Sequence, residues 1–270
     1  MTSMVSGHRA RKRFGQNFLV DEGVVRQIVA AIDPQPGDHL VEIGPGQGAL
    51  TGPLLKRVAR MDAIELDRDL CALLARHFSP DQLAIHSGDA LEFDFAALGE
   101  DLRVVGNLPY NVSTPLLFHL SRYADQCRDL HFMLQREVVE RMVAETSTTE
   151  YGRLSVMLQD RFDIEMLFEV PPESFRPAPK VTSAVVRLRP LRTAERAERG
   201  SAADPAMFAQ VVSSAFTMRR KTLRNALASQ VSASEIEALG IDPGLRPENL
   251  SPRQFAAIAD HCAARSKGTA

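Results

Sequence analysis

Apolar residues first recur at helical spacing shortly after residue 20. They would form one face of a helix, and they are Val24, Val25, Ile28, Val29 and Ile32. Asp21 precedes them and can act as the N-cap, because its carboxylate can accept free backbone N–H groups. The segment Asp33-Pro34-Gln35-Pro36-Gly37 follows them and cannot continue a helix. The pattern therefore predicts a helix over about residues 22–32.

Short apolar runs then alternate with helical patterns. Strands are predicted at 39–43, 61–64, 83–86, 102–105 and 129–134, and helices at 49–58, 67–77, 113–123 and 136–145. This alternation is typical of a parallel sheet that is covered by helices on both faces. Two more strands are predicted at 161–169 and 181–189. The four prolines of residues 171–179 exclude a helix or a central strand between them.

The last third of the chain has a different pattern. Residues 191–204 are polar and charged, which favours a linker, and residues 205–264 show only helical patterns separated by turns. We therefore expect an α/β domain over residues 1–190, a linker over 191–204 and a small all-α domain over 205–270.

Composition excludes several classes of protein. No run approaches the roughly 20 apolar residues of a membrane span, and the first residues lack the apolar segment of a signal peptide. Cys71, Cys127 and Cys262 lie far apart without a CxxC pair, which favours reduced thiols over disulfides or a zinc site. We expect a cytoplasmic protein without a metal centre.

Charge is distributed unevenly although the net charge is only −2. Residues 1–13 contain four Lys or Arg and no acid, residues 14–170 carry a net charge of −12, and residues 171–270 carry +6. Basic segments on both sides of an acidic body are expected where a polyanion is held around a site that binds something neutral or cationic. Solvated surface charge explains the counts equally well.

A glycine turn joins the predicted strand 39–43 to the next helix. Gly44, Gly46 and Ala49 fit the G-x-G-x-x-A pattern of dinucleotide sites, while Gly44, Gly46 and Gly48 fit the G-x-G-x-G turn of S-adenosylmethionine sites. Glu65 ends the second strand, where its carboxylate could bind the ribose hydroxyls of either cofactor. The loop alone leaves both cofactors open.

Asp89 favours the second cofactor. It directly follows the third predicted strand, where its carboxylate could accept a hydrogen bond from an adenine amino group. A pocket rich in carboxylates also suits a sulfonium cation better than a pyrophosphate. A helix cap or a loop carboxylate remains the alternative for both Glu65 and Asp89.

The tetrapeptide Asn107-Leu108-Pro109-Tyr110 follows the fourth predicted strand. An amino group on a nucleobase is a poor nucleophile because its lone pair is delocalised into the ring. The Asn107 side-chain oxygen and the backbone carbonyl of Leu108 or Pro109 could accept its hydrogens and point the lone pair at a methyl group. Tyr110 could stack on the base. A simple turn that closes the strand is the alternative.

Several segments in this order resemble one family, the 16S ribosomal RNA adenine N6,N6-dimethyltransferases. They are RKRFGQNFL at 11–19, VEIGPGQGALT at 41–51, IELDRDL at 64–70, GNLPYNVSTPL at 106–116, HFMLQREVVERMVA at 131–144, YGRLSVM at 151–157, PPESFRPAPKVTSAVVRL at 171–188 and RRKTLRNAL at 219–227. The resemblance implies a Rossmann-like, seven-stranded class I methyltransferase sheet with a small all-α C-terminal domain.

The resemblance also implies a function. The expected activity is dimethylation of two adjacent adenosines in the 3′-terminal hairpin loop of 16S rRNA, within an immature 30S subunit, by a monomer with a role in subunit biogenesis. S-adenosylmethionine would be the methyl donor, with S-adenosylhomocysteine as product. Tyr110 and Phe175 match the residues that sandwich the adenine. The residues matching cofactor contacts are Asn17, Leu19, Gly44, Gly46, Glu65, Asp89 and Asn107.

The basic residues that we expect to contact RNA phosphates form two groups. They are Arg11, Lys12 and Arg13 in the N-terminal tail, and Arg219, Arg220, Lys221 and Arg224, which are expected on one helix. Three alternatives remain open: a 23S rRNA adenine methyltransferase, a noncatalytic nucleic-acid factor on this scaffold, and a nicotinamide dehydrogenase.

Overall fold

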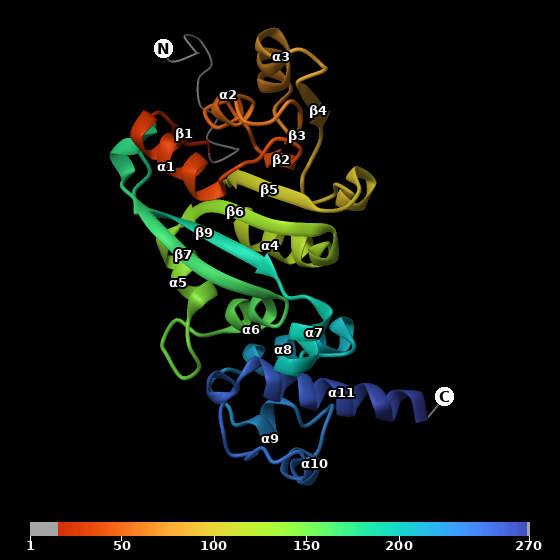
Figure 1. Ribbon diagram of the computed structural model, residues 1–270. Helices are drawn as coiled ribbons and strands as arrows, with labels where there is room; N and C mark the ends of the chain where they lie inside the picture. The colour runs from red at the N-terminus through yellow and green to blue at the C-terminus, as the bar shows by residue number, and fades with distance from the viewer. Residues whose placement is uncertain (1–15, 269–270) are drawn as a thin grey trace. The chain divides into compact units, whose positions relative to one another are not determined.

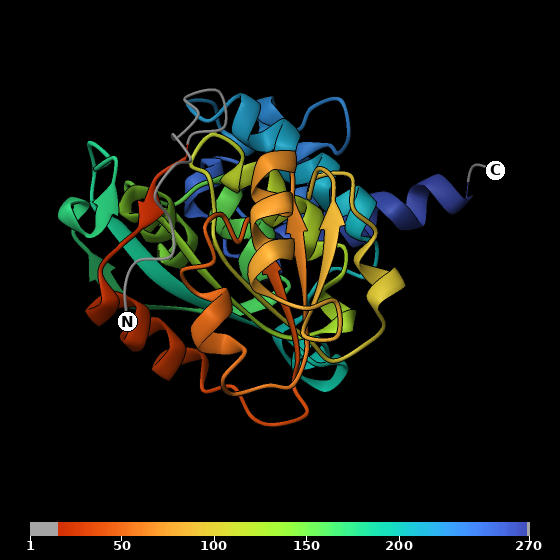
Figure 2. The ribbon, with the colours of Figure 1, turned by 90° about the horizontal axis from the view of Figure 1, so that it is seen from above.

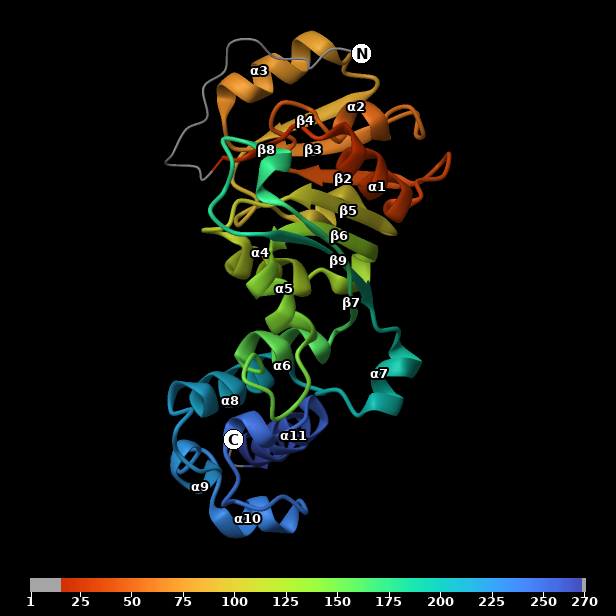
Figure 3. The same ribbon diagram turned by 90° about the vertical axis from the view of Figure 1, so that its left-hand side faces the viewer.

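Seven strands form one sheet within residues 16–268, the part of the chain that the computed structural model describes. Their order across the sheet is β4-β3-β2-β5-β6-β9-β7 (Figures 1 and 3). The strands are β2 (His39–Ile43), β3 (Met61–Glu65), β4 (Leu83–Ser87), β5 (Leu102–Asn107), β6 (Cys127–Gln135), β7 (Phe162–Val170) and β9 (Ser183–Pro190). All seven were predicted from the apolar runs, with ends within two residues of those observed.

The sheet is mixed rather than wholly parallel. Strands β4, β3, β2, β5 and β6 pair in parallel with their neighbours, and Figure 2 shows the arrows of β3 and β4, in orange, pointing the same way. Strand β9 is antiparallel to β6, with Ser183 opposite Gln135 and Leu188 opposite Leu130. The parallel arrangement predicted from the alternating strands and helices is confirmed for β4, β3, β2, β5 and β6, whereas no orientation was predicted for β9. Periodicity indicates that a segment is a strand but not which neighbour it pairs with.

Helices α1 (Glu22–Ile32), α2 (Thr51–Leu54) and α3 (Arg68–His77) contribute to one hydrophobic cluster with strands β2, β3, β5 and β6. Helix α1 begins as predicted, since the Asp21 carboxylate accepts the N–H groups of Gly23 and Val24. Helix α2 is much shorter than the predicted 49–58, because Gly52 and Pro53 disfavour a longer helix. Helices α4 (Ser113–Ser121) and α5 (Arg136–Val143) follow β5 and β6.

The proline-rich segment contains no long element, as predicted. A short 3₁₀ helix (Pro172–Ser174) leads into β8 (Phe175–Arg176). Strand β8 pairs antiparallel with β1 (Phe18–Leu19) in a separate two-stranded sheet. Neither two-residue strand was predicted, because each exists only through its pairing with a segment more than 150 residues away.

The chain divides into two compact units, which we describe separately. The sheet unit contains residues 16–139 and 164–190, and the helical unit contains residues 140–163 and 191–268. The helical unit consists of α6 (Arg153–Gln159), α7 (Thr193–Arg199), α8 (Pro205–Thr217), α9 (Leu223–Ala226), α10 (Ala233–Ala238) and α11 (Pro252–Gly268). Its core includes Tyr151, whose Oη donates to the carbonyl oxygen of Leu250 at 2.8 Å.

These boundaries differ from the predicted domains. Residues 140–163 belong with the helical unit, because Tyr151 and Val156 are buried in its core. The expected linker 191–204 contains helix α7, which has no buried residue and therefore no apolar stripe that could indicate it from sequence. No helix within residues 16–268 has the length and apolar composition needed to cross a membrane.

Candidate active site

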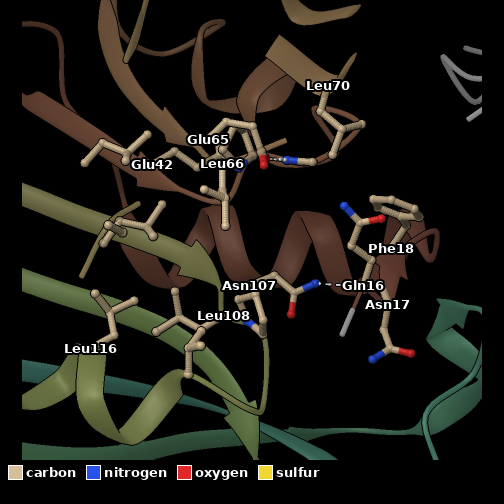
Figure 4. A pocket seen from close by; sticks show the side chains of 18 of the residues that line it. Gln16, Asn17, Phe18, Glu42, Glu65, Leu66, Leu70, Asn107, Leu108 and Leu116 are labelled. Atoms are coloured by element: carbon tan, nitrogen blue, oxygen red, sulfur yellow. Dashed lines mark hydrogen bonds between the residues drawn. The ribbon is translucent and has the colours of Figure 1, made fainter. Parts of the chain in front are cut away.

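A cavity of about 370 Å³ lies at the carboxyl ends of β2, β3, β4 and β5 in the sheet unit. This edge of an open α/β sheet is where ligands bind. Figure 4 shows Glu42, Glu65 and Leu66 on one side of the cavity and Asn107 and Leu108 on the other. The cavity wall includes every predicted cofactor contact, Asn17, Leu19, Gly44, Gly46, Glu65, Asp89 and Asn107, together with Leu108, Pro109 and Tyr110.

The glycine turn brings bare backbone to this cavity. Gly44 and Gly46 have φ values of 65° and 58°, in the left-handed region that favours glycine. The N–H of Gly44 donates to the Ile64 carbonyl at 2.9 Å, which fixes the turn against β3. Apart from Gly44 itself and its two neighbours in the chain, none of residues 16–268 has an atom within 4 Å of the position that a Gly44 Cβ would occupy. A ligand can therefore approach the main chain closely at this turn.

Glu65 connects the turn to the end of β3. Its Oε2 accepts the N–H of Gly46 at 3.1 Å, and its Oε1 accepts the N–H of Asp67 at 2.9 Å. Burial raises the pKa of Glu65, although these two hydrogen bonds oppose the shift. A carboxylate has about four acceptor positions, so each oxygen can still accept a hydroxyl hydrogen from a ligand.

Asp89 lies at the mouth of the cavity, in the turn after β4. Its Oδ1 accepts the N–H of Leu91 at 2.9 Å, which holds the exposed carboxylate in place. The turn is further fixed by the N–H of Gly88, which donates to the Glu65 carbonyl oxygen at 3.0 Å. Asp89 can fix this turn and also bind the cofactor, because the hydrogen bond from Leu91 occupies only one of its two carboxylate oxygens.

Glu42 is a third carboxyl group in the cavity wall, and sequence reasoning did not single it out. It is 2% exposed, and its Oε2 accepts the hydroxyl of buried Thr51 at 2.6 Å. Burial raises the pKa of Glu42 to about 7, and the nearby Glu65 adds to the shift. The available signal was its place in the apolar strand His39–Ile43, where a charged residue has no solvated side to face.

This burial predicts a pH-dependent cost in stability. Unfolded Glu42 ionises near its ordinary value of 4.5, but folded Glu42 holds its proton up to about pH 7. Folding therefore takes up a proton between these values, and stability falls as pH rises through them, by about 3 kcal/mol in total. Glu42→Gln is expected to raise the melting temperature of the ligand-free protein by roughly 5 to 10 °C at pH 8.

At pH 4, where Glu42 is protonated in both states, the same substitution is expected to leave the melting temperature almost unchanged. Glu22→Gln is the matched control, because the Glu22 side chain is 71% exposed. This substitution should leave the melting temperature unchanged at both pH values. Scanning calorimetry at the two pH values measures both variants. A gain for Glu42→Gln that is equal at pH 4 and pH 8 would exclude the protonation of Glu42 as its cause.

Asn107 ends β5 and faces the cavity from the side opposite Glu65 (Figure 4). Its Nδ2 donates to the Asn17 carbonyl oxygen at 3.0 Å. This bond engages the amide nitrogen and leaves the amide oxygen as the group that can accept a hydrogen from a ligand. The N–H of Leu108 donates to the Met133 carbonyl oxygen at 3.1 Å, so the strand end that bears Asn107 is fixed against β6.

The expected aromatic sandwich is not present in this structure. Tyr110 lines the cavity, but Phe175 is 0% exposed in the hydrophobic cluster of the sheet unit and does not line it. The pairing of β8 with β1 buries the Phe175 ring, which therefore has no free face for a base. Phe18, on the other strand of this pair, does line the cavity and was missed.

The predicted basic residues have different positions. Arg11, Lys12 and Arg13 lie outside the described residues. Arg219, Arg220 and Lys221 occupy the turn between α8 and α9 rather than one helix, and only Arg224 is helical. The prediction that these four residues lie on one helix was therefore wrong. Met218 leaves helical geometry at φ −111° and ψ 41°, which ends α8 before the basic residues.

Charge decides which cofactor fits the cavity. Glu65 and Asp89 contribute carboxyl groups to its wall, Glu42 adds a third that loses its proton only near pH 7, and no Lys or Arg lines it among the described residues. Carboxylates attract a cation and repel a pyrophosphate. The cavity therefore fits a small nucleoside ligand with a positive charge, such as a sulfonium, better than a dinucleotide.

Comparison with known proteins agrees with this interpretation. The profile of the family described as ribosomal RNA adenine dimethylase matches residues 7–264. A protein of Thiobacillus denitrificans named ribosomal RNA small subunit methyltransferase A is 58% identical over 258 residues, which cover 96% of this chain and 100% of that protein. A protein of the same name from Aromatoleum aromaticum is 58% identical over 262 residues and 97% of both chains.

Two solved structures share the fold. A dimethyladenosine transferase from Plasmodium falciparum has a TM-score of 0.77 at 23% identity, covering 93% of this chain and 98% of its own. The 23S rRNA methyltransferase ErmE has a TM-score of 0.68 at 24% identity, covering 92% and 100%. Both correspondences include the α/β and the helical parts of the chain. The family profile matches residues 7–264, which are nearly the whole of this chain. This chain therefore belongs to the ribosomal RNA adenine dimethylase family.

Proposed function

We propose that this protein transfers methyl groups from S-adenosylmethionine to the N6 amino groups of adenines in ribosomal RNA. The position of Asn107 carries the proposal. Its amide oxygen is free to accept at the end of β5, in a cavity whose opposite wall bears Glu65. A hydrogen-bond acceptor for an amine therefore lies in the same cavity as the groups suited to a cationic nucleoside.

The residues of the cavity divide between the parts of the cofactor. Glu65 would accept the ribose hydroxyls, Asp89 the adenine amino group, and the bare backbone at Gly44 and Gly46 would contact the remaining chain. When bound, S-adenosylmethionine supplies a methyl group that is electrophilic because its sulfur is positively charged. The β1 segment, which contributes Asn17 and Leu19, would close the cavity from the side.

The chain's own groups activate the amine. The Asn107 oxygen and the carbonyl of Leu108 or Pro109 accept its two hydrogens, which favours a pyramidal nitrogen with its lone pair toward the methyl group. As the nitrogen becomes positive, these preorganised dipoles stabilise the charge. The proton then leaves to solvent, so no strong base is required. Tyr110 provides a ring face for the base.

The proposed substrate is 16S rRNA, specifically two adjacent adenosines of its 3′-terminal hairpin loop in an immature 30S subunit. Support comes from the resemblance of the sequence motifs and from the names of relatives that are 58% identical. Dimethylation requires that the site also accepts a monomethylated amine. Such a substrate would place the protein in the cytoplasm. Action as a monomer stays a prediction.

Transfer of tritiated methyl groups to immature 30S particles, followed by mass spectrometry of the 16S 3′ fragment, tests the proposal. Two dimethyladenosines at the expected positions are the predicted result. Transfer to 23S rRNA instead would favour the alternative rRNA methyltransferase. Binding of RNA without transfer would indicate a noncatalytic factor, and binding of a nicotinamide cofactor in place of S-adenosylmethionine would indicate a dehydrogenase.

The basic residues of the helical unit provide a separate prediction for RNA binding. Arg219 is engaged within that unit, since its Nη2 donates to the Thr149 carbonyl oxygen at 3.0 Å and its Nε lies 3.9 Å from a Glu248 oxygen. Exposed Arg220, Lys221 and Arg224 are the cleaner test. Their triple alanine variant is expected to reduce the slope of log affinity against log salt by about 2 to 3, since each phosphate contact contributes roughly one.

A triple alanine variant of Lys56, Arg57 and Arg60 is the control, because it removes the same charge from exposed positions of the sheet unit. Its salt slope should remain that of the wild type. Filter binding of rRNA fragments at several salt concentrations measures both variants. Equal slopes in the two variants would exclude Arg220, Lys221 and Arg224 as specific phosphate contacts.

A further inference from the structure

The hydroxyl of Tyr110 is held by a buried serine from a distant strand. Tyr110 Oη and Ser183 Oγ are 2.6 Å apart, and Ser183 is 0% exposed. Tyr110 lies just after β5, whereas Ser183 is the first residue of β9. Strand β6 lies between these two strands in the sheet, so the tyrosine side chain reaches past the end of β6 to its partner.

The position of Ser183 is itself fixed by the backbone. Ser183 pairs with Gln135 at the end of β6. The next residue along the chain, Arg136, donates its N–H to the carbonyl oxygen of Thr182 at 3.0 Å. The serine hydroxyl therefore projects from the end of a paired strand within the sheet rather than from an unpaired loop.

Tyr110 is also held at its backbone. The hydroxyl of Ser113, which begins α4 and is 2% exposed, donates to the Tyr110 carbonyl oxygen at 3.1 Å. The residue is thus anchored at both ends, by Ser113 at its carbonyl and by Ser183 at its phenol. Tyr110 lines the cavity between these two anchors.

We propose that Ser183 is a positioning residue, which sets the orientation of the Tyr110 ring for stacking on the target base. The inference rests on the proposed function and deepens it. The O–H bond of a phenol prefers the plane of its ring because the oxygen is conjugated with that ring. A hydrogen-bond partner at a fixed point therefore restricts both the place and the plane of the ring, which preorganises a stacking surface.

The same contact argues against a role of the Tyr110 hydroxyl in proton transfer. Its hydroxyl is engaged with Ser183, on the far side of β6 from Asn107. Burial raises the pKa of Tyr110, although the bond with Ser183 opposes the shift, so the phenol remains neutral at physiological pH. Tyr110 would thus act through its ring face alone.

A double-mutant cycle tests the proposal with immature 30S particles as substrate. Tyr110→Phe and Ser183→Ala each break the same hydrogen bond and keep the ring, and each is expected to lower kcat/KM for the RNA by about 10-fold. The double variant should also lose about 10-fold, because the bond can be removed only once. Affinity for S-adenosylmethionine should stay within about 2-fold of wild type in all three variants.

Two further variants serve as controls for the cycle. Ser183→Cys keeps a heavy atom at the position of the serine oxygen but forms only a weak hydrogen bond, and should reproduce the loss of Ser183→Ala if the alanine variant folds poorly. Ser155→Ala removes another fully buried serine, in the helical unit, and should stay within about 2-fold of wild type.

Independent losses, which would multiply to about 100-fold in the double variant, would overturn the positioning role. So would a Tyr110→Phe variant that loses one limb of the pH–rate profile, since that result would assign the hydroxyl to proton transfer. Wild-type transfer in the same assay reports on the proposed function alone, and its absence would refute that function without any reference to the cycle.

Discussion

Asn107→Ala is expected to lower kcat for methyl transfer by about 10² to 10³. The substitution removes the amide oxygen that holds the amine and stabilises the positive charge on its nitrogen, and losing one such preorganised group commonly costs this factor. It also removes the bond from Nδ2 to the Asn17 carbonyl oxygen, so affinity for S-adenosylmethionine should fall as well, but by a smaller factor. Single-turnover rates at saturating cofactor isolate the effect on chemistry.

Asn111→Ala is the matched control for this prediction. Asn111 lines the same cavity, is exposed and belongs to the same loop, but no proposed step uses it. Its variant should transfer methyl groups within a few-fold of the wild-type rate. If Asn107→Ala reacted within 10-fold of wild type, the amide would not be what activates the amine.

Parts of this fold could be predicted from the sequence because the signals for them lie within the same short segment of the chain. Strand β2 has the predicted bounds because a buried parallel strand is mostly apolar, here Leu40, Val41 and Ile43, and a glycine turn ends it. Helix α1 combines a capping aspartate with an apolar stripe, so both its start and its buried face are specified within residues 21–32. These signals lie entirely within the segments that they describe.

Elements that depend on distant partners escaped prediction. Strands β1 and β8 are two residues each and pair with segments far away in the chain. Helix α6 begins at Arg153, and its N-cap residue, Gly152, has no side chain that could mark the start of a helix. The orientation of β9 and the assignment of residues 140–163 to the helical unit are likewise determined by tertiary packing. Local helix and strand propensities predict little where tertiary packing determines the structure.

The candidate site shows the same division. Glu65, Asp89 and Asn107 were expected at strand ends, and parallel pairing brings such ends to one edge, so the cavity collects them. Glu42 was missed because it lies within β2 rather than at the end of the strand, where site residues were sought. Phe18 was missed because it belongs to β1, which exists only through its pairing with β8. Burial of Phe175 arises from that same pairing.

The opposite end of β5 from Asn107 is held by a buried charge network. Arg103 is 6% exposed, and its guanidinium donates to Asp38 Oδ2 at 2.7 Å and to Asp129 Oδ2 at 2.9 Å. It also donates to the carbonyl oxygen of Ile32 at 2.6 Å, which satisfies the C-terminus of α1. One side chain therefore connects α1, β5 and β6 beneath the site.

Burial alone would raise the pKa of Asp38 and of Asp129. For Asp38 the N–H of Gln35 and Arg103 outweigh it, and for Asp129 His131 and Arg103 do, so both pKa values are lowered. The wild type therefore has this stabilisation in full above the ordinary value of 3.8 and loses it as pH falls through the lowered values.

Arg103→Met is expected to destabilise the protein by about 3 to 5 kcal/mol at pH 7.5, because it leaves the buried Asp38 and the partly buried Asp129 without their main cation. It should also weaken the pH dependence. With Arg103 gone, the N–H of Gln35 and Arg128 still lower the pKa of Asp38, and His131 still lowers that of Asp129, but each is opposed by the same burial, so both pKa values should lie above those of the wild type. The difference in stability between wild type and variant should therefore shrink as pH falls through the lowered pKa values of the wild type. Urea unfolding at several pH values measures both effects.

Arg128→Met is the control that separates burial from charge. Arg128 contacts the same Asp38, at 2.6 Å to Oδ1, but its side chain is 39% exposed and its other partner, Asp101, is 62% exposed. Solvent screens such a pair, so this variant should cost less than about 1 kcal/mol despite the identical change in charge. Equal losses in the two variants would attribute the stability to net charge, and the buried position of Arg103 would then contribute nothing of its own.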